Sequence, residues 1–500
     1  MKVIGIIAEY NPFHNGHAYQ IAEIRRLTGA DYIIVAMSGD FMQRGTPAII
    51  DKYTRSQMAL SCGVDLVIEL PTLWSTASAE DFAMAGVTIF EKMGCVDGIC
   101  FGAETKNLSL LSSLADILVD EPTDYRESLS SYIKEGLTFP AARARALVHY
   151  LTVSGSIGSL CVTEKTPSAE AISSIINEPN NILAIEYLKA LKRRHSSITP
   201  YLIKRTGAGY HDATICECIP SQTSLGLEDA PTASATAIRR LLLAQNLSAS
   251  SVCIGKGCNA LYHSVENDKA CLSDKAFLTL ANTMPHAASE LLFHYLQKSP
   301  ALCAEDFSQI LGYQLLNIKP ESLAAISDCN EDIANRLYRN RQSFYSYEQF
   351  IEQNKSKDVT YTRISRILLH LLLHISQEKE AVGKTNDYIP YLRILGFHKS
   401  SAASSALASV NDCTKETNQS ARGCAPLLTV LKQNASVPVI SKLADAKKNL
   451  PAQAFSMLED DIFAADLYEQ IKFQKQQQNP LTYRESAAAQ NEYTRGLVLL

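Results

Sequence analysis

Val3–His17 reads VIGIIAEYNPFHNGH, and this stretch decides the fold. Its first six residues form an apolar run that predicts a buried β-strand, and a polar turn follows. After the His-x-Gly-His segment, His14–His17, comes a helical pattern from about Ala18 to Leu27. A strand that leads into a helix N-terminus builds an anion site, because backbone N–H groups and the positive end of the helix dipole face the ligand. Gly16 lets a phosphate approach the backbone, and the two imidazoles can donate to phosphate oxygens on which charge develops.

The first hundred residues alternate short apolar runs with helical patterns. Strands are predicted at Val3–Ala8, Tyr32–Met37, Asp65–Leu70 and Gly98–Gly102, with further helices at Lys52–Cys62 and Ser78–Met93. This order predicts a Rossmann-like, doubly wound parallel sheet, in which ligands bind outside the carboxyl ends of the strands. Three polar loops fall at these ends, Glu9–His17, Ser38–Gly45 and Gly102–Glu104. We therefore expect the three loops to share one site.

Later in the chain the pattern becomes mainly helical. A helix over Ile182–Leu191 and a strand over Ile198–Ile203 are predicted first, and from about Phe293 onward strand signals are few. This change predicts an α/β domain over residues 1–300 and a helical domain over residues 301–500. Polar stretches at 154–174 and 400–423 indicate inserted surface loops, and the glutamine-rich tail after Lys472 is expected to be partly disordered.

The composition sets limits on the class of protein. With 46% hydrophobic and 20% charged residues, the chain is typical of a soluble globular protein. A net charge of −5 neither predicts nor excludes a nucleic-acid partner, because a local basic face decides such binding. The thirteen cysteines have no Cys-x-x-Cys or Cys/His spacing, which indicates free thiols in a reducing cytoplasm and no metal centre. No signal peptide is expected, and the longest apolar run, Ile367–Leu373, is far shorter than the roughly 20 residues of a membrane span.

Two further segments carry candidate site residues. In the loop Ser38–Gly45, Asp40 can orient a nucleophile or hold Mg²⁺ through water, or it can form an Asx turn beside a solvated arginine. The segment Thr232–Arg239 opens a helix with small hydroxyl residues, which are ordinary N-caps. The same hydroxyl groups, with Arg239, also suit a phosphate-binding turn. These residues alone do not decide between a structural and a functional role for the loop Ser38–Gly45 or for the segment Thr232–Arg239.

Together these segments resemble the bacterial tRNA(Met) cytidine acetate ligases, which belong to the His-x-Gly-His nucleotidyltransferase superfamily. The resemblance rests on Gly5–His17, Ser38–Gly45, Pro179–Leu188, Ile203–Arg205, Gly209–Asp212, Ala233–Arg239, Tyr361–Arg363, Tyr391–Phe397 and Ile440–Lys448. It spans most of the chain and fails at 154–174 and 400–423. The usual superfamily pattern Ile-Ser-Ser-Thr-x-x-Arg is altered here, since Ala233 and Ala235 replace the Ile and the second Ser. One phosphate donor is thereby lost, whereas Ser234, Thr236 and Arg239 remain.

The resemblance implies a two-step reaction. Acetate attacks the α-phosphate of ATP to give acetyl-adenylate, and the acetyl group then passes to N4 of the wobble cytidine of elongator tRNA(Met). ATP would bring Mg²⁺ with it. His14, His17 and Asp40 would be catalytic. The ATP site would comprise Ile7, Ala8, Glu9, Tyr10, Asn11, Pro12, Phe13, His14, Asn15, Gly16, His17, Ala18, Tyr19, Gln20, Gly102, Asn180, Arg205, Ser234, Thr236 and Arg239, and Asn180 is expected to cap its helix.

The helical part carries scattered cations with interleaved tyrosines. Cations neutralise phosphates and tyrosines stack on unpaired bases, so a tRNA-binding surface is one interpretation, and a solvated helix face over core tyrosines is the other. The candidate tRNA-binding residues are Arg336, Arg339, Arg363, Arg366 and Lys447. Arg363 and Arg366 share one helix face at i, i+3.

Two other functions compete with the ligase. A small-molecule adenylyltransferase would use the same histidine chemistry, but such enzymes are typically short single domains, and the long helical part argues against this. A non-catalytic RNA-binding protein on a synthetase-like fold would not need His14, Gly16, His17 and Arg239 intact.

Overall fold

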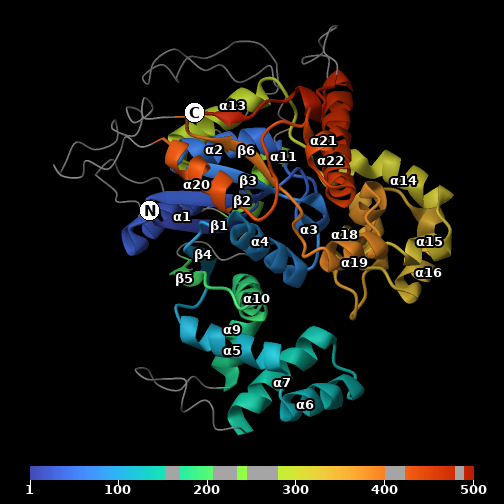
Figure 1. The fold of residues 1–500 in the computed structure, drawn as a ribbon. Helices are drawn as coiled ribbons and strands as arrows, with labels where there is room; N and C mark the ends of the chain where they lie inside the picture. The colour runs from blue at the N-terminus through green and yellow to red at the C-terminus, as the bar shows by residue number, and fades with distance from the viewer. Residues whose placement is uncertain (154–168, 206–233, 245–279, 400–422, 479–488) are drawn as a thin grey trace.

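In the computed structural model, one sheet runs through the centre of the protein (Figure 1). The structure describes residues 1–153, 169–205, 234–244, 280–399, 423–478 and 489–500. The parallel strands of the first half are β1 (Val3–Ala8), β2 (Tyr32–Ser38), β3 (Leu66–Leu70), β4 (Gly98–Ala103) and β5 (Thr199–Lys204). Their spatial order is β5-β4-β1-β2-β3. The predicted doubly wound sheet is confirmed, and these strands lie within one or two residues of their predicted bounds.

The chain reverses its direction across the sheet at β1. From β1 it winds outward through β2 to β3, and then crosses back to place β4 on the other side of β1. A ligand crevice forms outside the carboxyl ends of the strands at such a switch point. The loops after β1 and β4 therefore border the expected site.

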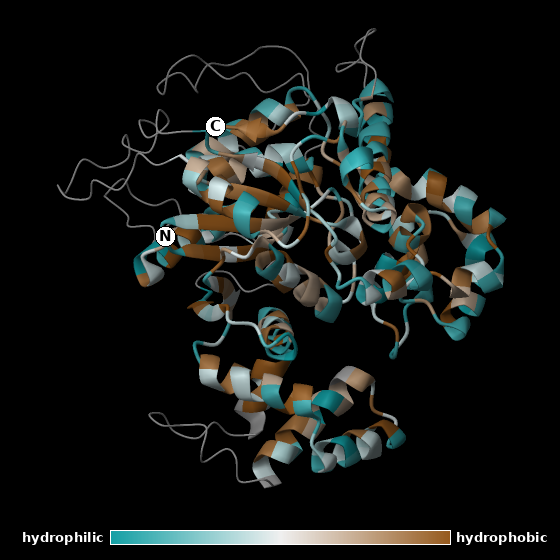
Figure 2. Cartoon of the chain, viewed as in Figure 1, coloured by the Kyte–Doolittle hydropathy of each residue, from teal (hydrophilic) through white to brown (hydrophobic). Residues whose placement is uncertain are grey.

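Helices cover both faces of the sheet. Alternate residues of β1 and β2 belong to different cores, with Val3 and Ile34 in one and Ile4 and Ile33 in the other. Because both faces are buried here, β1 and β2 consist almost entirely of apolar residues, and Figure 2 shows the strands at the centre of the sheet mainly in brown. The helices of the first half are α1 (Asn15–Thr28), α2 (Lys52–Ser61), α3 (Thr72–Ser75) and α4 (Ala79–Met93).

A helical lobe is inserted between β4 and β5, at the bottom of Figure 1. It consists of α5 (Leu108–Asp120), α6 (Thr123–Lys134), α7 (Phe139–Val153), α9 (Ala169–Asn177) and α10 (Pro179–Arg193). Helix α10 connects this lobe to the sheet, since it packs against α5 and against α4. Part of the predicted insertion, residues 154–168, lies outside the described residues.

The second half is mainly helical, as predicted, and its helices between residues 308 and 385 form a second lobe at the right of Figure 1. Before the sheet strand β6 its described elements are α11 (Ala235–Ala244), α13 (His286–Leu296), η2 (Ala304–Phe307), α14 (Ser308–Asn317), α15 (Pro320–Ala324), α16 (Glu331–Asn340), η3 (Arg341–Ser343), α17 (Tyr347–Asn354), α18 (Tyr361–Leu373) and α19 (Gln377–Thr385). After it come α20 (Ala425–Asn434), α21 (Ala446–Asn449), α22 (Ala452–Gln478) and η5 (Glu492–Thr494).

The second half also supplies three strands to the same sheet. Strand β6 (Leu392–Phe397) pairs antiparallel with β3, and β7 (Val439–Ile440) and β8 (Val498–Leu499) pair with β6. The domain boundary near residue 300 stays a prediction. The sheet contains strands from both sides of that boundary. Helix α22 continues to Gln478, so the first residues of the glutamine-rich tail are helical, and residues 479–488 lie outside the described residues. Within the described ranges, no helix is both long and apolar enough to cross a membrane.

Candidate active site

His14 and His17 stand at the start of helix α1, which begins at Asn15, three residues earlier than predicted. His14 is the N-cap, and its Nδ1 accepts a hydrogen bond from the backbone N–H of Gly16 at 3.1 Å. The Nδ1 of His17 accepts from the backbone N–H of His14 at 3.2 Å. A backbone amide can only donate, so neither Nδ1 carries a proton. Both neutral rings therefore carry their proton on Nε2, where it can be donated to a ligand.

Burial and nearby arginines keep these rings neutral. The pKa of His14 falls to about 3, mainly because the ring is buried and also because Arg205 and Arg239 repel its protonated form. Burial, then His14 and Arg205, lower the pKa of His17 well below its ordinary value. Two neutral Nε2–H donors are thus present across the physiological pH range.

The rest of the loop holds His17 in place. The rings of Tyr10 and Phe13 contact the His17 ring with centroids 4.8 and 5.4 Å away, and the His14 ring stacks on it at 3.8 Å. The side chains of Tyr10 and Phe13 are buried, so they pack against the histidine instead of facing solvent. Gly16 passes close to the His14 ring, because a Cβ at this position would lie 3.0 Å from its Cε1. A larger residue there would displace the cap.

Two arginines converge on the histidine pair from other elements. Arg205 follows β5, and a Cβ added to Gly102 at the end of β4 would lie 3.3 Å from its Cγ. Arg239, on α11, donates through Nη1 to the carbonyl of Asn11 at 2.8 Å and through Nη2 to Oγ1 of Thr236 at 3.1 Å. The positive charge of both reaches His14. The structure therefore brings His14, His17, Gly102, Arg205 and Arg239 together at the switch point of the sheet.

Ser234 acts as a helix cap in this structure. Its Oγ accepts from the backbone N–H of Ala237 at 3.1 Å at the start of α11. The ordinary N-cap interpretation is thus confirmed for Ser234, whereas a phosphate contact by Thr236 stays a prediction. Of the quoted similar segments, Gly209–Asp212 and the residues just before Ser234 lie outside the described part of the chain.

Asn180 does not cap its helix as expected. Helix α10 begins at Pro179, whose fixed φ suits the first helical position, and Glu178 occupies the cap position. Asn180 instead donates through Nδ2 to Oε1 of Glu104 at 2.5 Å. The other carboxylate oxygen of Glu104 accepts from the backbone N–H of Asn181 at 3.0 Å, and Oδ1 of Asn181 accepts from Glu104 N–H at 3.0 Å. This reciprocal pair fixes Asn180 beside the end of β4.

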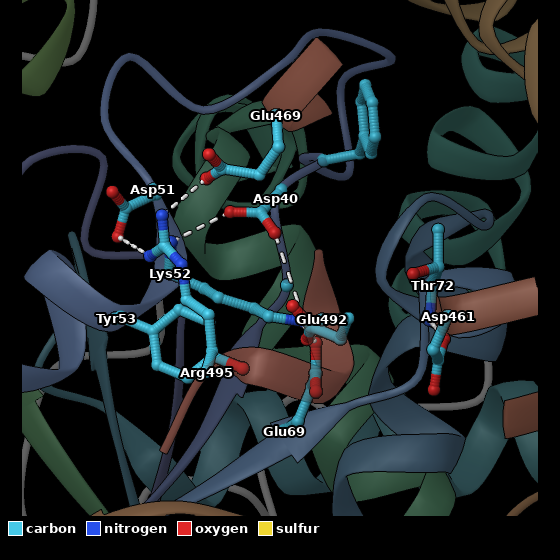
Figure 3. Close-up of polar contacts among 12 residues, drawn as sticks. Asp40, Asp51, Lys52, Tyr53, Glu69, Thr72, Asp461, Glu469, Glu492 and Arg495 are labelled. Carbon is cyan, nitrogen blue, oxygen red and sulfur yellow. Dashed lines mark hydrogen bonds and ion pairs between the residues drawn. The ribbon is translucent and has the colours of Figure 1, made fainter. Parts of the chain in front are cut away.

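Asp40 belongs to a buried group of charged side chains (Figure 3). One oxygen of Asp40 accepts from the backbone N–H of Lys52 at 2.7 Å, and the other lies 3.9 Å from its Nζ. Lys52 Nζ also pairs with Glu69 at 2.7 Å and with Glu492, and Arg393 pairs with the same two glutamates at 3.0 and 2.6 Å. Asp40 is thus committed to the start of α2 and to Lys52. Its catalytic role stays a prediction.

Burial and neighbouring charges shift the pKa values of two carboxyl groups in this group. Burial raises the pKa of Asp40 to about 7, although Lys52 and Arg55 oppose the rise. Burial disfavours the Glu492 carboxylate too, but Lys52 and Arg393 outweigh it and lower the pKa of Glu492 to about 2. Among the described residues no group of three His, Cys, Asp or Glu side chains is suited to a metal ion. A Mg²⁺ site at Asp40 is not supported, because this carboxylate is buried against Lys52.

The five candidate tRNA-binding cations occupy different environments. Arg339 and Lys447 are exposed, and Arg339 lines a polar cavity of about 500 Å³ on α16 with Arg336 and Tyr338. Arg336 donates to the carbonyl of Asn354 at 2.9 Å. Arg363 and Arg366 do share a face of α18, but both are held by Asp328, Arg363 through its carbonyl and Arg366 through its carboxylate at 2.6 Å.

Sequence reasoning missed several residues that shape the site. Arg55, Glu69 and Glu492 are fixed by contacts between distant segments and carry no local pattern. Glu104 lies in one of the three polar loops. Its position directly after a strand is the sequence feature that could have identified it as a site residue.

Comparisons with known proteins place the chain in a family. Residues 1–415 match the family model described as HIGH Nucleotidyl Transferase. A protein of Thermoanaerobacter sp. (strain X514) named tRNA(Met) cytidine acetate ligase is 35% identical over the full length of both chains. A protein of the same name from Caldanaerobacter subterraneus subsp. tengcongensis is 36% identical, with 94% of this chain and 95% of that protein covered.

Solved structures agree with these sequence matches. The crystal structure of Thermotoga maritima TmcAL in its apo form superimposes with a TM-score of 0.78 at 25% identity, over the full length of both chains. A second structure of that protein, bound with alpha-thio ATP, gives a TM-score of 0.76 at 25% identity over 100% of this chain and 99% of that one. The chain described here belongs to the tRNA(Met) cytidine acetate ligases, within the HIGH nucleotidyl transferase family.

Proposed function

We infer that this protein is an ATP-dependent ligase that acetylates cytidine in tRNA(Met), the activity for which its relatives are named. The observation that carries this inference is the histidine pair at the switch point of the sheet. Two neutral rings with Nε2–H donors lie at the N-terminus of α1, with the charges of Arg205 and Arg239 close by. Such a site suits a triphosphate, and the Thermotoga maritima TmcAL crystal structure holds an ATP analogue.

In the first step that we propose, a carboxylate oxygen of acetate attacks the α-phosphorus of ATP. The bond from Pα to the bridging oxygen breaks, and pyrophosphate leaves with the electron pair. His14 and His17 donate from Nε2 to the phosphate oxygens on which charge develops, and Arg205 and Arg239 balance the charge of the leaving pyrophosphate. Gly102 gives the nucleotide room beside Arg205.

In the second step, N4 of the wobble cytidine of elongator tRNA(Met) attacks the acetyl carbonyl carbon. The bond to the adenylate oxygen breaks, AMP leaves, and the N4 proton passes to solvent. Mg²⁺ enters this scheme with ATP as part of the substrate, because the described residues offer no carboxylate cage to hold it as a resident ion. We place the reaction in the cytoplasm, in keeping with the free cysteines among the described residues.

The helical C-terminal part supports a tRNA-binding role through its position. Helix α18 lies against the loop that follows β2, where Oγ of Ser365 donates to the carbonyl of Gly45 at 2.9 Å. Gly45 has φ +77°, and a Cβ there would lie 2.5 Å from the carbonyl carbon of Ser365. This packing holds α18, which belongs to the helical part, beside the loop that follows the carboxyl end of β2. We assign the exposed Arg339 and Lys447 to phosphate contacts.

Incubation of the purified protein with labelled acetate, ATP and total tRNA tests the function. We expect label on tRNA(Met) only when ATP is present, and AMP and pyrophosphate as products. ATP turnover with another small substrate and no label on tRNA would instead indicate an adenylyltransferase. RNA binding without ATP turnover would indicate a non-catalytic protein.

A further inference from the structure

Arg55 is a fully buried arginine in α2 whose guanidinium group faces backbone carbonyls. Its Nε donates to the carbonyl of Ile50 at 3.1 Å. Its Nη1 donates to the carbonyl of Glu9 at 2.7 Å and to that of Ser38 at 3.0 Å, and its Nη2 donates to that of Gly39. A guanidinium has five N–H donors in a fixed planar arrangement, which no other side chain offers.

These carbonyls lie at the carboxyl ends of two neighbouring strands. Glu9 directly follows β1, and Ser38 is the last residue of β2. Carbonyl groups beyond the last ladder bonds need another donor when they are buried. Arg55 supplies it to both strands through one nitrogen atom, Nη1, and so fixes the separation of the two strand ends.

The segment between β2 and α2, residues 39–51, contacts the histidine loop at two further points. The backbone N–H of Gln43 donates to Oε1 of Glu9 at 2.8 Å, and the backbone N–H of Ile49 donates to Oδ1 of Asn11 at 2.8 Å. Asn11 precedes His14 by three residues, and its carbonyl receives Nη1 of Arg239. The path from Glu9 to His14 is therefore set by the segment that Arg55 anchors.

We propose that Arg55 is a positioning residue for adenylate formation, which it serves by fixing the loop that carries His14 and His17. The reaction named in this inference rests on the proposed function. The choice of Arg55 rests on the geometry of the loop. Without the guanidinium group of Arg55, the carbonyl groups of Glu9 and Ser38 turn toward other donors. The histidine rings then move relative to the bound nucleotide. A displacement of about 1 Å at a reacting centre can cost about a hundredfold in rate.

Arg55→Lys and Arg55→Met test the proposal, since lysine keeps the charge but has three donors on one atom. The matched control is Lys189→Met, which removes another buried cation, one that pairs with Glu186 at 2.6 Å on α10. Thermal unfolding of each variant identifies the ones that fold at the assay temperature. The rate readout is acetate-dependent exchange between ATP and labelled pyrophosphate.

For folded Arg55→Lys we expect kcat of the exchange to fall about tenfold to a hundredfold, with a smaller change in KM for acetate. Labelling of the histidine rings with ¹³C at Cε1 gives a second readout. The resonances of His14 and His17, assigned by substitution, should shift in both Arg55 variants and stay in place in Lys189→Met. A Lys189→Met variant of equal stability should keep its exchange rate.

Unchanged exchange and unchanged His14 and His17 resonances in folded Arg55→Lys would overturn the proposal. Equal losses of exchange in Arg55→Lys and in an equally destabilised Lys189→Met would do so as well. Failure of the proposed function is distinguishable, because it would appear as wild-type protein that labels no tRNA. In that event the histidine resonances and the binding of ATP to the variants still decide the role of Arg55.

Discussion

The rings of His14 and His17 are stacked, 3.8 Å between centroids and 25° from parallel, and each uses its two nitrogen atoms for different purposes. Nδ1 of each accepts a backbone N–H in the first turn of α1, whereas Nε2 carries the proton. Folding and chemistry thus depend on opposite sides of the same rings, so they can be separated by substitution.

His14→Asn and His17→Asn should strongly slow adenylate formation and leave helix α1 intact. The asparagine Oδ1 can replace Nδ1 as the acceptor, and asparagine is among the best N-cap residues, but the Nε2–H donor is lost. We expect kcat for acetate-dependent ATP–pyrophosphate exchange to fall by about 10² to 10³ in each variant. The melting temperature and the tRNA dissociation constant should stay close to the wild-type values. Loss of tRNA binding together with exchange would contradict this separation.

The buried histidines should also destabilise the protein in acid. The pKa of His14 is about 3 when folded and near 6.5 when unfolded, so below pH 6.5 the unfolded chain binds a proton that the folded chain does not. Stability from this group is complete above pH 6.5 and is lost progressively as the pH falls toward 3. At pH 5 the loss is about 2 kcal/mol. Urea unfolding from pH 7 to 5 should show a shallower pH dependence in His14→Asn, and an equal dependence would disprove the assignment.

Gly102 and Arg205 should act as one unit in ATP binding. A Cβ on Gly102 would press on the Arg205 side chain, 3.3 Å away at Cγ. We therefore expect Gly102→Ala and Arg205→Gln each to weaken ATP binding, and the double variant to be little worse than Arg205→Gln alone. Calorimetric titration with ATP measures all four corners of this cycle. Additive effects would show that the two residues act independently.

Glu492 should stabilise the fold strongly from near the end of the chain. Its carboxylate pairs with Lys52 and Arg393, and Glu492→Gln would leave two buried cations short of a partner. Breaking such a buried pair costs about 3–5 kcal/mol. Glu459→Gln, at an exposed position of α22, serves as the control and should change the free energy of unfolding by less than about 0.5 kcal/mol. Equal stability of the two variants would contradict the role of the buried group.

Arg339 and Lys447 should contribute to tRNA binding without affecting ATP. Each phosphate contact adds about one unit to the slope of log affinity against log salt concentration. We expect Arg339→Gln and Lys447→Gln to weaken tRNA binding, to lower this slope and to leave ATP–pyrophosphate exchange unchanged. Lys432→Gln, at an exposed position of α20, is the matched control. Equal binding by all three variants would place the tRNA elsewhere.

The sequence was sufficient to predict the parallel strands and the histidine loop, because both depend on local patterns. An apolar run that ends in a polar turn identifies a buried strand, and helix start signals follow it directly. The cap of α10 was expected at Asn180 and lies two residues earlier, at Glu178, because Pro179 takes the first helical position. Local sequence patterns predicted the helix but not the residue at its N-cap position.

Contacts between distant segments could not be predicted in this way. Lys52 meets Glu492 across 440 positions, and β6 is a short apolar run among helices whose strand character depends on pairing with β3. The role of Arg55 is equally hidden, since an arginine in an amphipathic helix is usually solvated. These residues acquire their function only when the complete sheet has formed.

The pairing of β6 with β3 has a consequence for synthesis on the ribosome. Residues 66–70 emerge more than 320 residues before Leu392–Phe397, the strand that covers their open edge. During that interval the nascent chain exposes a row of unpaired backbone groups on an apolar strand, which is a template for association with other chains. Fragments that stop before residue 397 should therefore aggregate, and the growing chain should need chaperone protection until its second half has been translated.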